Sequence, residues 1–323
     1  MNSIYIGIDT SNYTTSAAAV TEYGELVANI KAPLPVASGE KGLRQSDALF
    51  SHVKALPEVI GEVSAAVSER LGGGYKIAAV GVSDSPRNVP GSYMPCFLAG
   101  VSAASSTAGL FRVPLYRFSH QEGHIEAALF GAGHCPSGSF YSFHLSGGTC
   151  ELLRVESESA GVRRTASIVS KTLDITCGQL IDRCGVALGL LFPCGAGLEK
   201  LAMESVREFK IKPAVFPDGI NISGFENKFL AMLNTSTPSD AAKFVFDAVF
   251  ECIRAMLGAI PPSDSNTYVV FAGGVMSSSL IKARLIREFP SAASSGRFLF
   301  APPALSSDNA AGIALLARKA DMK

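Results

Sequence analysis

Residues 4–20 read IYIGIDTSNYTTSAAAV, and this opening stretch decides the fold. A short segment containing Gly24 follows it, and residues 26–32 (LVANIKA) are apolar again. This pattern predicts two strands joined by a glycine-containing turn, which form a β-hairpin. Residues 140–155 (FYSFHLSGGTCELLRV) repeat the plan, with small hydroxyl and glycine residues between apolar strands. The repetition predicts two duplicated lobes.

Helices and strands alternate between and after these hairpins. Residues 47–71 carry apolar residues at helical spacing, and residues 76–83 (KIAAVGVS) follow as a buried strand. This alternation favours an α/β protein with a mixed or parallel sheet and helices on its faces. The later segments are interpreted as an insertion near 203–238, a helix at 239–258 capped by Ser239, and strand–turn–helix units at 267–289 and 297–320.

The same pattern predicts the domain boundaries. At 323 residues the chain is long enough for two lobes, each with its own core. We expect an N-terminal lobe at 1–117, a second lobe at 118–300 that includes the insertion, and a closing strand–loop–helix at 301–323.

The composition is that of a protein with a large core. Hydrophobic residues make up 47% of the chain and charged residues 17%, which excludes a disordered chain. No apolar run reaches the ~18 residues of a membrane helix, and the first residues do not resemble a secretion signal, so we expect a cytoplasmic protein with no membrane partner. Lys plus Arg equals Asp plus Glu at 28 each, so RNA would bind through a local patch or a partner rather than through net charge.

The seven cysteines are scattered along the chain and form no Cys-x-x-Cys pair. Their spacing argues against a disulfide framework and against a zinc site made of cysteines. We therefore expect buried free thiols.

Three junctions between a strand and a loop are rich in glycine and hydroxyl residues: Asp9-Thr10-Ser11, Ser146-Gly147-Gly148-Thr149 and Gly273-Gly274. Glycine lets the backbone approach a phosphate closely, and exposed amides and hydroxyls donate to its oxygens. One such loop is also typical of an ordinary tight turn. Three of them at comparable points of duplicated halves favour a cleft that binds a nucleotide.

The most specific local motif is His120-Gln121-Glu122-Gly123-His124. On a helix the two histidines lie one turn apart on the same face, so both imidazoles can reach one metal ion. Asp308, where a Pro-Pro loop enters a helix, is the best candidate for a third ligand. The alternative is two surface histidines that share a face by chance. Glu122 is one residue away from the position that zinc-protease motifs require, which disfavours protease chemistry.

Taken in order, several motifs of the chain resemble one family, the tRNA threonylcarbamoyl transferases of the TsaD (Gcp) type. They cover nearly the whole length: GIDTS at 7–11, HQEGH at 120–124, HLSGG at 144–148, the stretch DITCGQLIDRCGVALGLLFPCGAGLEKLA at 174–202, ISGFENKF at 222–229, FAGGV at 271–275 and SSDNAAGIA at 306–314. The resemblance implies the duplicated actin, Hsp70 and sugar-kinase fold, with two lobes around a nucleotide cleft.

The resemblance also implies roles for the matching residues. His120, His124 and Asp308 would hold one iron or zinc ion. The threonylcarbamoyl-adenylate, or an ATP-like adenine nucleotide, would be bound by residues from the second half of the chain: His144, Leu145, Ser146, Gly147, Gly148, Asp182, Gly195 and Ser278. Candidates for additional contacts with phosphate are Thr10, Ser11 and Arg87.

The reaction implied is transfer of a threonylcarbamoyl group from its adenylate to the exocyclic amine of the adenosine beside the anticodon of certain tRNAs. Such enzymes work with partner proteins of the family type. Catalysis would come from placement of the reactants and from charge stabilisation by the metal, without a covalent enzyme intermediate.

Some positions depart from the family pattern. The family has an Asp-Glu pair soon after its opening Thr-Ser, where this chain has Asn12-Tyr13-Thr14-Thr15. Thr149 stands in place of a histidine and Ser278 in place of an asparagine, and residues 84–93, with Arg87, replace a glycine-rich loop. Two other functions therefore stay open: a regulatory paralogue that binds nucleotide and metal without transfer, and an ATPase or phosphotransferase of the same fold.

Overall fold

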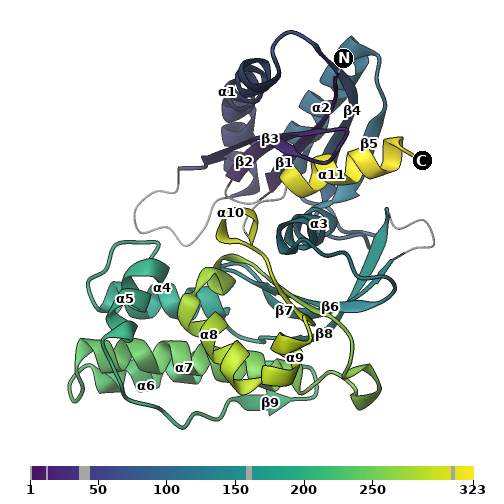
Figure 1. The fold of residues 1–323 in the computed structure, drawn as a ribbon. Helices are drawn as coiled ribbons and strands as arrows, with labels where there is room; N and C mark the ends of the chain where they lie inside the picture. The colour runs from purple at the N-terminus through teal and green to yellow at the C-terminus, as the bar shows by residue number, and fades with distance from the viewer. Residues whose placement is uncertain (1, 12–13, 36–43, 158–161, 307–309) are drawn as a thin grey trace. The chain divides into compact units, whose positions relative to one another are not determined.

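Two compact units make up the chain, and each is built on a five-stranded sheet with helices (Figure 1). In this computed structural model the described residues are 2–11, 14–35, 44–157, 162–306 and 310–323. The first unit consists of Met1–Gly131, Ser157–Thr165 and Asp308–Lys323. The second consists of Ala132–Glu156 and Ala166–Ser307.

The sheet of the first unit has the strand order β3-β2-β1-β4-β5. The pairs β1–β2 and β2–β3 are antiparallel, whereas β4 runs parallel to both β1 and β5. The strands are β1 (Asn2–Ser11), β2 (Thr14–Thr21), β3 (Leu26–Pro33), β4 (Tyr75–Ser85) and β5 (Leu115–Ser119).

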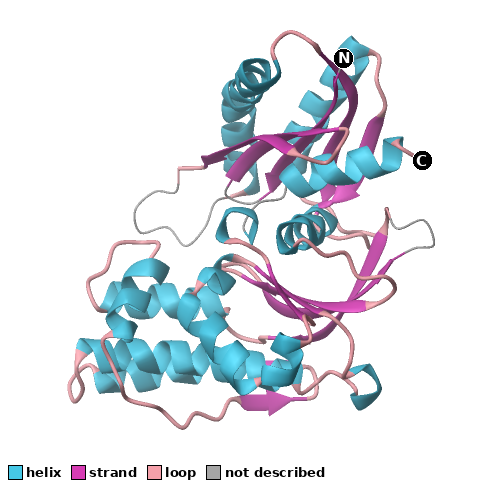
Figure 2. Ribbon diagram, viewed as in Figure 1, coloured by secondary structure: helices cyan, strands magenta, loops and turns pink. Residues whose placement is uncertain are grey.

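Helices cover both faces of this sheet (Figure 2). On β1, Ile4 and Ile8 belong to the core beneath α1 (Gln45–Leu71) and α2 (Phe97–Phe111). Tyr5 belongs to the core beneath α11 (Ala310–Asp321). Successive side chains of a strand point to opposite faces, so a strand that is apolar at almost every position is the one expected between two helical layers.

The predicted hairpin is wrong in one respect: the segment contains three strands instead of two. Residues 4–20 are divided between β1 and β2, which pair antiparallel with Ser11 opposite Thr14. The turn containing Gly24 then joins β2 to β3. The prediction missed the first boundary because no glycine or proline marks it. Residues 12 and 13 lie outside the described part of the chain.

The helix α3 (His120–Ala132) follows β5 directly, and most of it groups with the first unit. A Cβ atom added to Gly312 of α11 would lie 1.9 Å from the carbonyl oxygen of Gly123. This close contact between α3 and α11 is possible only because Gly312 has no side chain. The sequence-based boundary at residue 118 assigned the helix to the second lobe, whereas its contacts place it with the first unit.

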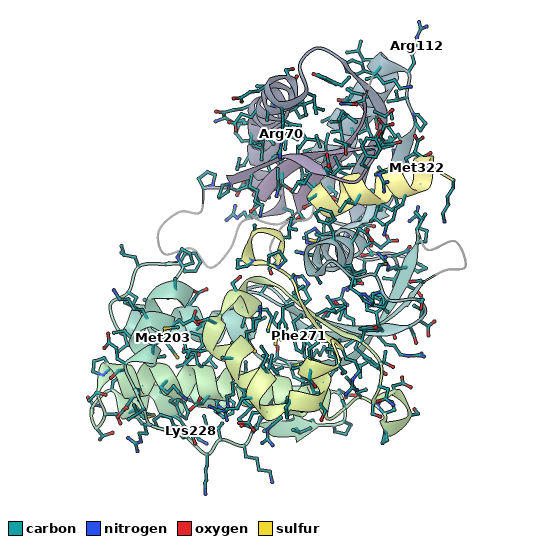
Figure 3. All side chains as sticks on the ribbon, viewed as in Figure 1. Arg70, Arg112, Met203, Lys228, Phe271 and Met322 are labelled. Carbon is teal, nitrogen blue, oxygen red and sulfur yellow. The ribbon has the colours of Figure 1, made fainter. Side chains whose placement is uncertain are left out.

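The second unit has a sheet of order β12-β11-β6-β7-β8 and a two-stranded ribbon, β9–β10. Its core lies between the sheet and the helices around α7, and Figure 3 shows Phe271 inside this unit. The strands are β6 (Phe140–Leu145), β7 (Cys150–Ser157), β8 (Arg164–Lys171), β9 (Ala214–Phe216), β10 (Gly219–Asn221), β11 (Val269–Ala272) and β12 (Phe298–Phe300). The helices are α4 (Cys177–Ala187), α5 (Gly195–Met203), α6 (Ser223–Met232), α7 (Pro238–Leu257), α8 (Ser279–Glu288), α9 (Pro290–Ser294), α10 (Pro303–Ser306) and the short 3₁₀ segments η1 (Pro262–Asp264) and η2 (Gly274–Ser277).

The predicted strand–loop–strand at 140–155 and the strand–turn–helix at 267–289 are confirmed. The cap of the helix predicted at 239–258 is wrong: α7 begins at Pro238, and the Thr237 hydroxyl accepts a hydrogen bond from the Asp240 N–H at 3.1 Å. Proline fits the first helical position because that residue has no intrahelical acceptor for an N–H. Within the described residues, no helix is both long enough and apolar enough to cross a membrane.

Asp174 caps a helix from a distant position in the chain. The N-cap residue of α6, Ile222, has no side chain able to cap, and the Asp174 carboxylate instead accepts the N–H groups of Ile222 and Ser223. Burial opposes ionisation of this carboxyl, but these bonds and the N–H of Ile175 outweigh it and lower the pKa of Asp174.

We expect Asp174→Ala to lower the free energy of unfolding by about 1–2 kcal/mol at pH 7, the usual cost of losing a helix cap. The folded pKa lies below the unfolded one, so this contribution is present above the unfolded pKa and is lost as the pH falls through the folded pKa. Urea unfolding of both proteins at pH 7 and at about pH 3 measures it. An equal difference at the two pH values would contradict the cap.

Candidate functional site

The helix that carries the two histidines is fixed at its first turn. Ser119 ends β5, and its N–H and hydroxyl donate to the Glu122 carboxylate at 2.8 and 2.9 Å. The Glu122 N–H in turn donates to the Ser119 hydroxyl at 3.2 Å. These reciprocal bonds form a capping box, so α3 begins at His120. The N–H of Arg164 donates to the other oxygen of Glu122, which anchors the same turn to β8.

The imidazoles of His120 and His124 lie together, as the spacing predicts. Their ring centroids are 4.5 Å apart, and the ring planes are inclined at 74°. His124 is buried and His120 is half-buried. Two imidazoles bound to one metal at about 2.1 Å per Metal–N bond have centroids roughly 4.5–5 Å apart, so the pair fits a shared metal ion.

Asp9, at the end of β1, orients the first histidine. Its carboxylate oxygen lies 3.1 Å from His120 Nδ1. A carboxylate at one ring nitrogen selects the tautomer that leaves the other nitrogen for a metal. Histidines that bind metals commonly have such a carboxylate hydrogen-bonded to the ring nitrogen that does not bind the metal.

Asp9 is itself fully enclosed, with 1% of its surface exposed. The hydroxyls of Ser11 and Ser83 donate to its two oxygens. Burial opposes ionisation, but the interaction with His120 and the hydrogen bonds from Ser83 and Ser11 outweigh it and lower the pKa of Asp9. The carboxylate is therefore ionised and held in one orientation.

The third predicted ligand, Asp308, lies with its neighbours 307–309 outside the described residues. Among the residues that are described, no group of three His, Cys, Asp or Glu side chains could hold a metal ion. The start of α11 at Ala310 is fixed against α3 by the contact between Gly312 and Gly123.

The hydroxyls of Thr10 and Ser11, at the first of the three predicted junctions, form hydrogen bonds inside the first unit. Thr10 Oγ1 donates to the Cys96 carbonyl at 3.1 Å and accepts the Gly100 N–H at 3.1 Å. Ser11 donates to Asp9 at 2.7 Å. Both side chains thus hold α2 and Asp9 in place, and their contact with phosphate stays a prediction.

The loop of residues 84–93 is attached to the histidine helix. The Gln121 N–H donates to the Pro86 carbonyl at 3.1 Å, and the Arg87 N–H donates to the Ser92 hydroxyl at 3.0 Å. Arg87 is half-buried and lies next to the residue that contacts α3. Its role toward phosphate stays a prediction.

The loop between β6 and β7 is closed by the side chain of Ser146. The Ser146 hydroxyl accepts the N–H groups of Gly148 and Thr149 at 3.3 and 3.0 Å, while Gly147 and Gly148 are exposed. His144 and Leu145 end β6, immediately before it. Gly273 follows the neighbouring strand β11 with a positive φ of 98°, and a Cβ there would lie 2.2 Å from the Leu145 carbonyl oxygen. The second and third glycine loops are therefore side by side.

Two other predicted residues, Asp182 of α4 and Gly195 of α5, lie close to each other. The Cys194 N–H donates to Asp182 at 2.9 Å, which places this carboxylate beside Gly195. Partial burial raises the pKa of Asp182, and the bond from Cys194 opposes this effect.

Ser278 is joined to the same helices. Its hydroxyl donates to Glu199 of α5 at 3.0 Å and accepts the Ile281 N–H at 3.3 Å as the cap of α8. Glu199 also accepts from the Ser279 hydroxyl and the Leu280 N–H. Asp182 and Ser278 are thus each hydrogen-bonded to α5 or to its N-cap residue Cys194, and Gly195 is the first residue of α5.

The positioning roles of Asp9, Glu122 and Glu199 were not predicted from the sequence, where Asp9 appeared only within the Asp9-Thr10-Ser11 junction. Asp9 carried a signal, because an acidic residue at the end of an apolar strand is buried and needs a partner. Glu122 carried one too, three residues after Ser119 in the spacing of a capping box. Glu199 carried none, since it is separated in sequence from α8 and looks like any exposed helix residue.

Comparison with solved structures identifies the fold. The chain is similar to component A of the (R)-2-hydroxyglutaryl-CoA dehydratase of Acidaminococcus fermentans, with 15% identity, a TM-score of 0.58 and coverage of 99% of both chains. It is also similar to the activator of the 2-hydroxyisocaproyl-CoA dehydratase of Clostridium difficile with bound ADPNP (14% identity, TM-score 0.56, 99% of this chain and 96% of that one). A third is HypF of T. kodakarensis, at 13% identity, a TM-score of 0.57, and coverage of 99% of this chain and 47% of that one. The predicted α/β fold of the actin, Hsp70 and sugar-kinase type is confirmed.

Comparison with curated sequences identifies the family. The chain is 26% identical over 326 residues to the tRNA N6-adenosine threonylcarbamoyltransferase of Listeria welshimeri, covering 97% of this chain and 90% of the relative. The enzyme of the same name from Bacillus subtilis is 26% identical over 329 residues, covering 96% and 88%. A model of the family TsaD, tRNA N6-adenosine threonylcarbamoyltransferase, matches residues 45–315. The chain therefore belongs to the TsaD family of tRNA N6-adenosine threonylcarbamoyltransferases.

Proposed function

We propose that this protein transfers a threonylcarbamoyl group from threonylcarbamoyl-adenylate to the adenosine beside the anticodon of tRNA. Family membership supports the reaction class. The observation that carries the proposal for this chain is the pair of imidazoles on α3, 4.5 Å apart, with Asp9 at Nδ1 of His120. That arrangement is suited to an iron or zinc ion, which we assign to His120, His124 and Asp308.

The metal, when bound, would supply positive charge for the anionic part of the donor. The side chains of this unit do the positioning. Asp9 fixes the ring of His120, and the capping box of Glu122 fixes the turn from which both histidines project. Because these groups are ordered before substrate binds, little reorganisation is required during the reaction.

The adenylate would be bound by the second unit. The backbone at the exposed residue Gly147 suits a phosphate, and Asp182 suits the hydroxyls of a ribose. Gly195 lies beside Asp182 and leaves room for the nucleoside. Transfer would then depend on placement of the carbamoyl carbon near the acceptor amine, without a covalent enzyme intermediate.

Transfer is tested with purified protein, threonylcarbamoyl-adenylate and unmodified tRNA, with and without partner proteins of a related TsaD system. The measurement is threonylcarbamoyl-adenosine in digested tRNA by mass spectrometry. We expect the modified nucleoside to form with a metal-loaded protein. Its absence under all these conditions would reject the proposal.

A second function is favoured by one observation. The Ser278 hydroxyl, at the position where the resemblance expects an asparagine, is fully engaged with Glu199 and Ile281. A chain altered here and at Thr149 could bind nucleotide and metal yet regulate a partner without catalysing transfer. Binding of the nucleotide with no modified tRNA would select this function.

The orienting role of Asp9 gives a further prediction. We expect Asp9→Asn to weaken Zn²⁺ affinity by about 10–100-fold, because loss of an outer carboxylate misorients the ligand ring. Competition with a chromophoric chelator measures the affinity, and Asp9→Glu should recover part of it. The matched control Asp47→Asn, at an exposed position of α1, should leave the Zn²⁺ affinity unchanged. If Asp9→Asn bound Zn²⁺ as tightly as the unchanged protein while its melting temperature fell, Asp9 would be structural only.

A further inference from the structure

Two buried cysteines meet directly beneath the loop between β6 and β7. The Sγ atoms of Cys150 and Cys177 are 3.1 Å apart, and the two side chains are 3% and 0% exposed. Cys150 is the first residue of β7, next to Thr149 of the loop. Cys177 is the first residue of α4. This pair could not be predicted from local sequence, because 27 residues separate the two thiols.

The end of α4 that carries Cys177 is packed tightly on the same loop. The hydroxyl of Thr176 donates to the Gly147 carbonyl at 2.8 Å. A Cβ added to Gly178 would lie 2.7 Å from the Cα and N atoms of Gly147. The end of the helix and the loop are therefore in direct contact, with no space for a side chain between Gly178 and Gly147.

We propose that Cys150 and Cys177 are an oxidation site, a dithiol that hydrogen peroxide converts to a disulfide and that controls the geometry of the Ser146–Thr149 loop. Oxidation itself is independent of the proposed function. The consequence for nucleotide affinity rests on the proposed role of this loop.

The reaction balances with one peroxide. The Cys150 thiolate attacks an oxygen of hydrogen peroxide, the O–O bond breaks, and Cys150 becomes a sulfenic acid with release of hydroxide. The Cys177 sulfur then attacks the sulfenic sulfur, and the S–O bond breaks to release water as the S–S bond forms. Two thiols are oxidised by two electrons, and peroxide is reduced to two waters.

The surroundings of the two thiols indicate which one attacks the peroxide and which one attacks the sulfenic acid. The hydrogen bond from Cys177 lowers the pKa of Cys150, although burial opposes the shift, so Cys150 is the more readily ionised thiol. Burial raises the pKa of Cys252 on α7 well above its ordinary value, and Cys150 raises it further, so Cys252 is less readily ionised than Cys150. Cys252 is therefore the matched control.

Disulfide formation would move the loop. A disulfide has an S–S distance of about 2.05 Å, so the sulfurs must approach by roughly 1 Å. The contact between Gly178 and Gly147 leaves no room for α4 to move toward the loop without displacing it. We expect the loss of one or two hydrogen bonds to a phosphate, equivalent to about tenfold weaker binding of a nucleotide.

The experiment treats the full-length protein with hydrogen peroxide, then blocks free thiols and digests it for mass spectrometry. We expect a cross-linked peptide pair containing Cys150 and Cys177, about 2 Da lighter than the sum of the reduced peptides and reversed by dithiothreitol. Cys252→Ala should still form it, whereas Cys150→Ala and Cys177→Ala should not. If both thiols of the folded protein stay reduced under conditions that oxidise free glutathione, the oxidation site is rejected.

A fluorescent ATP analogue then measures the consequence in reduced and oxidised protein. About tenfold weaker binding after oxidation, restored by dithiothreitol and absent in Cys177→Ala, would support control of the loop. Equal binding by both forms would overturn it. If the reduced protein does not bind the analogue, the proposed nucleotide site fails, and the mass measurement still decides the disulfide.

Discussion

Replacing His124 with alanine is expected to lower the rate of threonylcarbamoyl transfer by about 10³-fold or more and to remove the bound metal. Loss of an outer carboxylate alone costs about 10–100-fold in metal affinity, so loss of a direct ligand costs more. The ring centroids of His120 and His124 are 4.5 Å apart, so both imidazoles can bind the same ion. A single remaining imidazole is a poor site for zinc or iron. The transfer assay and elemental analysis of the same sample measure both effects.

The matched control for this variant is His134→Ala. His134 is exposed and follows the end of α3, and its ring contacts the ring of Tyr268, the residue before β11. We expect it to transfer the group at an unchanged rate and to keep its metal. Wild-type transfer by a folded His124→Ala protein would exclude the metal centre from the mechanism.

A Gly312→Ala substitution is expected to have the largest effect on stability. The new Cβ would lie 1.9 Å from the Gly123 carbonyl oxygen and 3.0 Å from the Ala127 N, and all these atoms belong to helix backbones. Neither helix can give way without losing its contacts, so we expect the free energy of unfolding to fall by about 3 kcal/mol. For a unit of this size that corresponds to a melting temperature roughly 6–12 °C lower.

Gly61→Ala controls for the effect of alanine in a helix. Gly61 lies inside α1, where an added Cβ would meet nothing within 4 Å. Here alanine is expected to stabilise the protein by about 0.5–1 kcal/mol, because glycine loses more backbone entropy on folding. Thermal unfolding of both variants measures the difference. A Gly312→Ala protein as stable as Gly61→Ala would mean that α3 and α11 do not pack as described.

The fold was largely predictable from periodicity. The helix α1 and the strand–loop–strand from β6 to β7 follow directly from the spacing of their apolar residues. The boundary between β1 and β2 was not predictable, because both strands are buried on both faces and neither alternation nor glycine marks the break. The predicted cap of α7 was wrong for a local reason: Thr237 and Ser239 are both residues that cap helices, and the prediction overlooked that Pro238 fits the first helical position.

The candidate site was predictable where a motif is local. His120 and His124 share one helix, so helical geometry alone brings their rings together. Asp9 reaches His120 across 111 positions of sequence, and Glu199 reaches Ser278 across 79, so no local pattern could reveal them. The Cys150–Cys177 contact was missed for the same reason. Long-range pairs depend on how strands and helices meet, which one sequence does not show.

The central claim is that the histidine pair of α3 binds one metal ion. Elemental analysis of the purified protein after reconstitution with Zn²⁺ or Fe²⁺ and removal of excess metal tests it most directly. We predict one ion per chain for the unchanged protein and for His134→Ala, and none for His120→Ala or for Asp308→Ala. An equal metal content in all four proteins would contradict the account.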